Sequence, residues 1–192
     1  MDLNAFFGAE FAEHRDVALR TEAALCAAFG GLVSACVTSV RAGGKLMFFG
    51  NGGSAADAQH LAAELTIRYK KNRAAISAIA LTTDSSALTA AGNDLGFDQI
   101  FARQVEALGR RGDVAIGIST SGRSPNVLAA LKKAKSIGMV TAALGGKGGG
   151  QMGEMTDYLL AVPSDTTARI QEMHIALGQM LCGALEIELG LA

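Results

Sequence analysis

The sequence contains no tryptophan, and only 5% of its 192 residues are aromatic. Bulky rings therefore contribute little to packing. Glycine and alanine are abundant instead, so helices can approach a sheet and one another closely. This composition suits a tightly layered α/β protein. Because the length is sufficient for one well-buried core and 49% of the residues are hydrophobic, we expect residues 1–192 to form a single domain.

Neither sign of charge dominates the chain, since 17 basic and 18 acidic residues give a formal net charge of −1. The basic residues are scattered among acidic ones. No basic patch therefore favours nucleic acid or an acidic membrane surface as a partner. A small molecule is the favoured ligand.

Signals for secretion and for membrane insertion are also lacking. No basic segment followed by an apolar core opens the chain at Met1, and we expect no stretch to reach the roughly 20 apolar residues of a membrane span. Cys26, Cys36 and Cys182 have no C-x-x-C spacing and are odd in number, which predicts buried free thiols. We expect a cytoplasmic protein with no membrane partner.

Hydrophobic periodicity changes along the chain. Helical spacing from about Asn4 to Val40, interrupted at Gly30-Gly31, predicts two N-terminal helices. Five short apolar runs follow, and they are Lys45–Phe49, Ile76–Leu81, Val114–Ile118, Met139–Leu144 and Tyr158–Val162. Their continuous apolarity predicts parallel strands covered on both faces, hence a three-layer α/β/α sandwich with a five-stranded parallel sheet. A long amphipathic helix is expected from Thr167 to about Leu189.

The first expected strand runs into Gly50-Asn51-Gly52-Gly53-Ser54, followed by a helix that carries Asp57, His60 and Glu64. His60 and Glu64 share one helix face, behind a turn whose backbone N–H groups are free for a ligand. Ser54 and Asp57 also have the spacing of a capping box, which is a purely structural helix start. Alone, either His60 or Glu64 would favour a structural role. Side by side behind the turn, they favour an active site.

A similar turn follows the third expected strand. Pro125 suits the first position of a helix, and Ser124 suits the N-cap before it. Four hydroxyls in six residues exceed the needs of a cap, and these are Ser119, Thr120, Ser121 and Ser124. With the free N–H groups and the positive helix end they predict a cradle for a phosphate monoester. Ligands of such sheets bind beyond the carboxyl ends of the strands, where both turns lie.

Weaker signals occur elsewhere. The positive charge of Arg68–Arg73 is interpreted as a solvated helix end. A turn at Asn93-Asp94 needs only Asx chemistry, and a function there stays open. Gly145–Gly150 lacks the spacing and the Ser or Thr of a P-loop, and no dinucleotide fingerprint opens a helix, which disfavours nucleotide binding.

The C-terminal helix contributes further polar residues. Gln171 and Gln179 are eight residues apart, about 80° around the helix axis, so both could reach one site loosely. His174 points elsewhere, and we interpret it as a core or interface residue.

Together these motifs resemble the sugar isomerase (SIS) domain family, specifically its phosphoheptose isomerases. They are GNGGSAADAQH at 50–60, ALTTD at 80–84, GNDLGF at 92–97, GISTSGRSPNV at 117–127 and ARIQEMH at 168–174. The resemblance implies one SIS domain with a sheet of flavodoxin-like strand order, a homotetramer, and active sites built from more than one subunit. It also implies conversion of sedoheptulose 7-phosphate to D-glycero-D-manno-heptose 7-phosphate for the heptose of lipopolysaccharide or capsule.

The resemblance also implies roles for single residues. The serine and threonine hydroxyls would hold the phosphate, and the sugar site would be lined by Asn51, Gly52, Gly53, Glu64, Asn93, Asp94 and Gln171. His60, Glu64 and Gln171 match the ligands of one zinc ion per subunit, with Glu64 as the catalytic base and His60 beside it. Gln179 replaces the family's histidine, and its amide can hold a metal only weakly and cannot carry a proton near neutral pH.

A second interpretation is a non-catalytic SIS protein that binds phosphosugars or associates with the bacterial replication initiator. The resemblance implies that this non-catalytic branch has lost the helix carboxylate along with the C-terminal histidine. This chain has Gln179 in place of that histidine but retains Glu64. Its presence here favours the isomerase.

Overall fold

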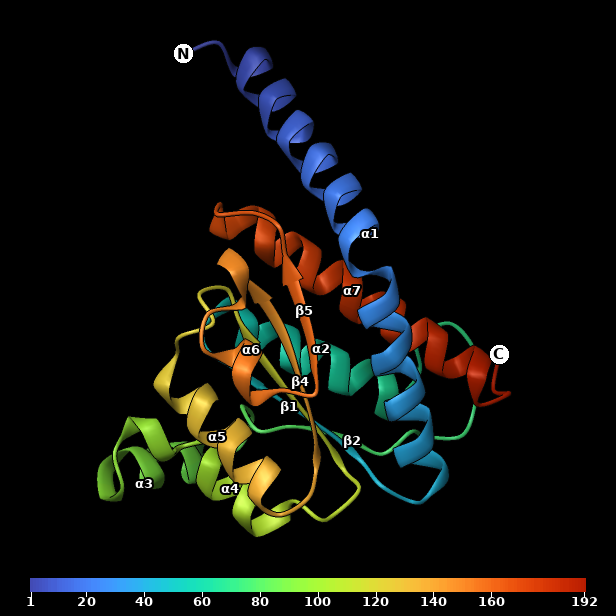
Figure 1. Ribbon diagram of the computed structural model, residues 1–192, viewed down its shortest axis with the longest axis vertical. Coiled ribbons are helices and arrows are strands. Elements are labelled where there is room, and N and C mark those ends of the chain that lie inside the picture. The colour runs from blue at the N-terminus through green and yellow to red at the C-terminus, as the bar shows by residue number, and fades with distance from the viewer.

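The computed structural model describes residues 1–192, and its centre is a parallel five-stranded sheet of order β2-β1-β3-β4-β5 (Figure 1). The strands are β1 (Leu46–Gly50), β2 (Ala78–Ala80), β3 (Val114–Ser119), β4 (Val140–Gly146) and β5 (Tyr158–Val162). Every neighbouring pair is parallel. This is the flavodoxin-like order. The predicted sheet is confirmed, and each strand lies within two residues of its predicted bounds.

Helices cover both faces of the sheet (Figure 1). They are α1 (Leu3–Arg41), α2 (Gly53–Thr66), α3 (Ser85–Asp94), α4 (Ala102–Leu108), α5 (Pro125–Ser136), α6 (Met152–Met155) and α7 (Thr167–Glu188), with short 3₁₀ turns η1 (Phe97–Gln99) and η2 (Lys147–Gly149). Alternate residues of β1 enter different cores. Leu46 and Phe48 pack with α1, α2 and α7, whereas Met47 and Phe49 pack with α4, α5 and α6. The predicted three-layer sandwich is therefore confirmed.

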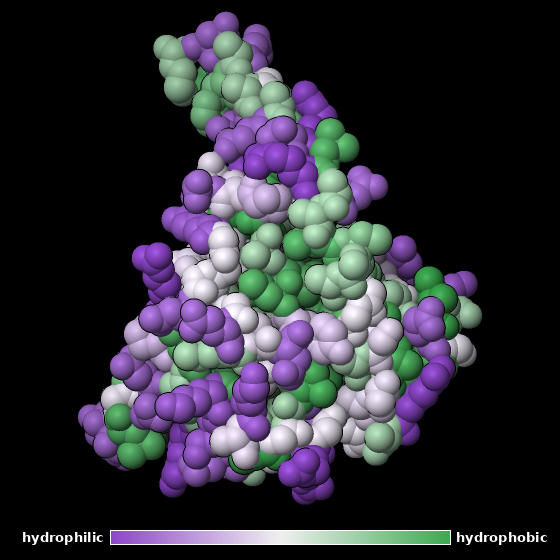
Figure 2. Space-filling view, viewed as in Figure 1, coloured by the Kyte–Doolittle hydropathy of each residue, from purple (hydrophilic) through white to green (hydrophobic).

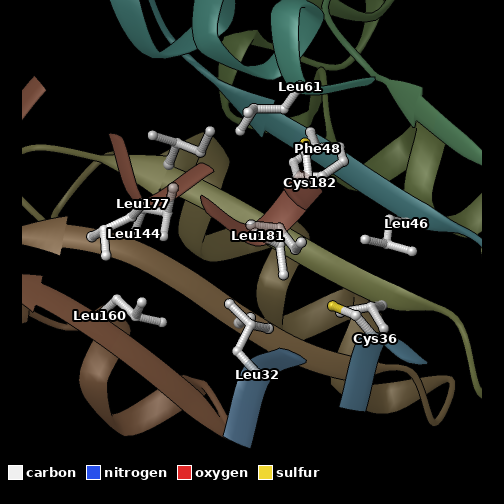
Figure 3. Packing of buried hydrophobic residues seen from close by; sticks show 14 of the residues in the cluster. Leu32, Cys36, Leu46, Phe48, Leu61, Leu144, Leu160, Leu177, Leu181 and Cys182 are labelled. Atoms are coloured by element: carbon white, nitrogen blue, oxygen red, sulfur yellow. The ribbon is translucent and has the colours of Figure 1, made fainter. Parts of the chain in front are cut away.

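Three helices meet on the first face. Leu32 of α1, Leu61 of α2 and Leu181 of α7 belong to one core cluster, in which Leu181 lies between the other two (Figure 3). Gly178 brings α7 close to α2, because a Cβ at that position would lie 2.5 Å from the Leu61 side chain. This packing presents the next residue of α7, Gln179, to the exposed side of α2.

Helix α1 is one continuous helix, so the prediction of two helices broken at Gly30-Gly31 is wrong. Glycine weakens a helix by about 1 kcal/mol relative to alanine, but tertiary packing overrides this preference here. A Cβ at Gly31 would lie 2.8 Å from Tyr158 Cε1, so the glycine allows α1 to lie directly on β5. The N-terminal part of α1 extends beyond the body of the protein (Figure 1).

The expectation that no segment is apolar enough to span a membrane is also wrong. By length and composition alone, α1 qualifies, because an 18-residue window has a mean hydropathy of 1.9. Part of this apolarity belongs to the protein core, since Val33, Cys36 and Val37 pack against the sheet and α7.

All three cysteines are free thiols, as predicted, but only two are buried. Burial raises the pKa of Cys36 and of Cys182 to about 12, so both stay protonated and inert. Cys26 is exposed, contrary to prediction, because it lines an open groove between α1 and α7.

Candidate active site at the carboxyl ends of the strands

Three serine hydroxyls converge after β3. Ser119 Oγ lies 3.0 Å from Ser124 Oγ and 3.4 Å from Ser121 Oγ, and Ser119 is only 5% exposed. The half-buried Thr120 lies between them in the chain. Ser121 Oγ also accepts a hydrogen bond from the backbone N–H of Arg123. The loop thus gathers hydroxyls around one point, as expected of a phosphate cradle.

Ser124 occupies the N-cap of α5 and Pro125 its first position, as predicted, but the Ser124 side chain does not cap the helix. Its hydroxyl faces Ser119 instead. The interpretation of Ser124 as a capping residue therefore does not hold. The positive end of α5 faces the hydroxyl cluster without a serine cap, which favours an anion there.

The segment Gly145–Gly150 packs against the hydroxyl loop. The backbone N–H of Gln151 donates to the carbonyl of Gly122 at 3.0 Å. Gly122 has a φ of 63°, and a Cβ there would collide with the carbonyl oxygen of Gly149. The two glycine segments pack backbone against backbone, a role that the sequence did not indicate.

Helix α2 begins within the glycine-rich turn that follows β1. Gly52 is the N-cap with a φ of 55°, and no side chain caps the helix. The structural alternative, a capping box formed by Ser54 and Asp57, is therefore not present. Ser54 lies buried inside the first turn. Gly53 makes room for α7, because a Cβ there would lie 2.6 Å from Gln171 Nε2.

A pair of asparagines joins the two turns. Asn51 Nδ2 donates to Asn126 Oδ1 at 2.9 Å, and Asn126 Nδ2 donates to Asn51 Oδ1 at 2.8 Å. Asn126 is 1% exposed, and sequence reasoning gave it no role. The pair ties the start of α2 to the start of α5, so the two candidate half-sites form one unit.

The α2 face carries the candidate chemistry. His60 Nε2 lies 3.3 Å from Glu64 Oε1, and Gln179 Nε2 lies 2.6 Å from His60 Nε2. The His60 side chain is 46% exposed and that of Glu64 is 22% exposed, so a ligand can reach both. Burial raises the pKa of nearby Asp57, opposed by the charge of His60.

This face of α2 offers two of the donor types that zinc prefers. Zinc binds imidazole and carboxylate strongly and amide oxygen weakly. His60 and Glu64 supply the two strong donors, and Gln179 adjoins them. Gln171 lies at Gly53 and is about 12 Å from Gln179 along the α7 axis. No group of three or more His, Cys, Asp or Glu side chains is placed to hold a metal ion, so one chain offers zinc only two strong donors.

Asn93 and Asp94 lie apart from this cluster. They end α3 and do not form the expected turn, and both are exposed. Asn93 Nδ2 donates to Asp94 Oδ1 at 2.7 Å, and neither bonds to another candidate site residue. Figure 1 shows α3 at the edge of the molecule, away from α7.

The side chains of His174 and Arg73 are both buried. His174 is fully buried, with Nε2 2.9 Å from the Gly145 carbonyl, which confirms it as a core residue. Burial lowers its pKa, opposed by that hydrogen bond. The interpretation of Arg68–Arg73 as a solvated helix end is wrong for Arg73. Helix α2 ends at Thr66, and the Arg73 side chain is buried against Glu186.

Residues 11–146 match the SIS domain family, so the chain is an SIS-domain protein. It is 58% identical to a phosphoheptose isomerase from Paramagnetospirillum magneticum, over 97% of each chain. A phosphoheptose isomerase from Campylobacter jejuni is 56% identical over 92% of this chain and 95% of that protein. Within the SIS proteins, the chain belongs to the phosphoheptose isomerase family.

Solved structures agree with this assignment. The fold matches a phosphoheptose isomerase structure from Neisseria gonorrhoeae with a TM-score of 0.90 and 45% identity, over 96% of this chain and 99% of that one. One from Francisella tularensis matches with a TM-score of 0.94 and 37% identity, over 97% and 100%.

Proposed function

We propose that this chain isomerises sedoheptulose 7-phosphate to D-glycero-D-manno-heptose 7-phosphate, for the heptose of lipopolysaccharide or capsule. One observation carries the proposal. A carboxylate and an imidazole, Glu64 and His60, lie 3.3 Å apart on a helix that is tied through Asn51 and Asn126 to a cradle of serine hydroxyls. The arrangement provides an acid–base pair and an anchor for a phosphate.

The hydroxyl loop anchors the far end of the open-chain sugar. Ser119, Ser121 and Ser124 donate hydrogen bonds to the phosphate oxygens, and the positive end of α5 offsets their charge. Holding the phosphate restricts where the reacting carbons lie, which lowers the entropic part of the barrier.

Glu64 serves as the base. Its carboxylate takes a proton from C1 of the ketose, the C–H electrons form the C1=C2 bond of an enediolate, and the same carboxylate returns the proton to C2. His60 stabilises the charged enediolate oxygens and assists proton exchange between them. Gln179 lies against His60 and orients its ring.

Zinc is part of the proposal as an ion held by His60 and Glu64, with the amide of Gln179 as a weaker donor. Gln171, which lies beside Gly53 at the start of α2, is too far from His60 to share this ion within one chain. When bound, it would polarise the substrate oxygens. The proton transfer itself belongs to Glu64.

The decisive assay offers purified protein sedoheptulose 7-phosphate, with and without added zinc, and follows formation of the aldose. Fructose 6-phosphate is the control, because it has the same phosphate and ketose groups on a shorter chain. Turnover supports the proposal. Calorimetric binding of the phosphoheptose without any turnover would overturn it and favour a non-catalytic SIS protein.

We also propose a cytoplasmic homotetramer in which neighbouring subunits complete the site with Asn93 and Asp94. Phe6, Phe7 and Phe11 are exposed on the projecting part of α1. An apolar groove of about 480 Å³ lies between α1 and α7, lined partly by Leu25 and Met173, and hydrophobic side chains gather there on the surface (Figure 2). Other copies of the chain suit these surfaces, because exposed patches of this kind mark interfaces.

This assembly is tested by light scattering on the purified protein. The double change Phe7→Ser and Phe11→Ser should shift the mass from tetramer to smaller species. Leu108→Ser is the control, because Leu108 is 44% exposed on α4, far from the α1 surface. A wild-type monomer would overturn the proposal.

A further inference from the structure

Arg73 is buried in an unusual position for an arginine. Its side chain is 2% exposed, and it lies beyond the last residue of α2. The guanidinium donates from Nη2 to the carbonyl oxygen of Glu64 at 2.8 Å and from Nη1 to that of Leu65 at 2.6 Å. The carbonyls at the end of a helix have no partners within the helix, so Arg73 satisfies two of them. One of the two belongs to the proposed catalytic base.

Glu186, in the last turns of α7, holds Arg73 in place. Its side chain is also 2% exposed, and Oε1 lies 2.9 Å from Arg73 Nε. It accepts further hydrogen bonds from the backbone N–H groups of Tyr69 and Lys70. Burial alone would raise the pKa of Glu186, but these three donors together lower it, so the carboxylate stays charged. The pair thus clamps the chain after α2 to the end of α7.

The clamp lies on the same two helices as the proposed chemistry. Gly178 of α7 touches Leu61 of α2, and the adjacent Gln179 meets His60. Glu186 follows Gly178 by eight residues, about 12 Å along the helix. The segment of α2 that carries His60 and Glu64 is therefore fixed against α7 at both ends.

We propose that Arg73 is a positioning residue for the isomerase, held by Glu186. Arg73 donates a hydrogen bond to the Glu64 carbonyl oxygen and so fixes how α2 lies along α7. This position of α2 keeps the Glu64 carboxylate and His60 aligned with Gln179. The planar fork of arginine is needed because lysine cannot reach a carboxylate and two carbonyls at once. This inference rests on the proposed function for its kinetic readout only.

Arg73→Met tests the proposal. We expect kcat for sedoheptulose 7-phosphate to fall at least tenfold, because the base loses its alignment. KM should change less than threefold, because the hydroxyl loop on β3 and α5 is untouched. A wild-type kcat, or a loss confined to KM, would overturn the proposal.

Arg73→Met leaves Glu186 buried without its partner and can unfold the protein, so a second variant is needed. Arg73→Met with Glu186→Met removes both charges, and such apolar replacements are often neutral for stability. The double variant should fold yet keep the low kcat, because the Glu64 carbonyl is still released. Recovery of the wild-type kcat would show that the pair is purely structural.

The ion pair of Lys45 and Asp113 is a matched control. Its Asp113 side chain is 4% exposed, and the pair joins the amino ends of β1 and β3, opposite the site. Lys45→Met should lower the melting temperature and leave kcat unchanged. An equal fall in kcat at an equal loss of stability would overturn the positioning role.

A measurement independent of turnover separates this inference from the proposed function. The chain has three histidines, so the ring nitrogen signals of His60 can be assigned by NMR with a His60→Asn variant. Arg73→Met should shift these signals, and Lys45→Met should not. If the wild type turns over no phosphoheptose, the proposed function fails, and the His60 signals still decide whether Arg73 positions this face.

Discussion

The hydroxyl loop, residues 119–124, and the α2–α7 face, formed by His60, Glu64 and Gln179, are built in different ways. The loop gathers Ser119, Ser121 and Ser124 from six consecutive residues at the end of one strand. The α2–α7 face brings Gln179 to His60 across 119 positions of sequence. A phosphate cradle can thus be made by one turn, whereas the reactive face depends on how two helices pack. Changes in the loop should weaken binding, and changes on the face should slow chemistry.

The largest effect is expected on the α2–α7 face. Glu64→Gln should lower kcat by roughly 10²- to 10⁴-fold, because the amide keeps the shape of the side chain but cannot accept the proton. KM should stay near the wild-type value, since the loop holds the phosphate. Steady-state kinetics measure both, and a near-normal kcat would place the base elsewhere.

The loop should show the opposite pattern. Replacing Ser119, Ser121 and Ser124 with alanine should weaken phosphoheptose binding at least about tenfold, because one hydrogen bond to a charged group contributes about 1.5–3 kcal/mol. The protein should stay folded, since Ser124 does not cap α5. Calorimetry measures the affinity, with Ser136→Ala at the other end of α5 as the control. Unchanged affinity would exclude the loop as the phosphate site.

Gln179→His changes the α2–α7 face and leaves the hydroxyl loop intact. The imidazole should tighten zinc binding by about tenfold or more, about 1.4 kcal/mol, because it is a better zinc ligand than an amide oxygen. Turnover should rise as well if proton transfer at this position limits the rate. Zinc titration by calorimetry is the test, and an unchanged affinity would remove residue 179 from the donor set.

The smallest effect concerns His174, which lies behind both regions. Because burial lowers its pKa below the ordinary value of 6.5, the unfolded chain binds a proton more readily. Its contribution to stability is therefore complete above about pH 6.5 and is lost as the pH falls from there through the folded-state pKa, by about 1.4 kcal/mol for each unit of pKa difference. Urea unfolding at pH 7.5 and 5.5 should show a smaller loss for His174→Gln. An equal loss would assign the acid sensitivity to other groups.

The local sequence pattern predicted the strands correctly but missed the features that depend on contacts between residues distant in sequence. The five strands were predictable because continuous apolar runs report burial on both faces. The break at Gly30-Gly31 was wrongly predicted, because the contact with Tyr158 that accounts for the glycine is 127 residues away from Gly31. Arg73 was wrongly interpreted for the same reason, since its partner Glu186 lies on another helix.

Spacing within a strand, turn or helix is set by local backbone geometry, so the amino-acid sequence was enough to predict the layered parallel sheet, the hydroxyl-rich turn after β3 and the common face of His60 and Glu64. The hydrogen bonds by which Asn126 joins the two turns, and the contact of Gln179 with His60, depend on the folded chain. Such contacts join segments that are distant in sequence, and they arise when apolar faces pack and close approach is allowed, as at Gly178 against Leu61.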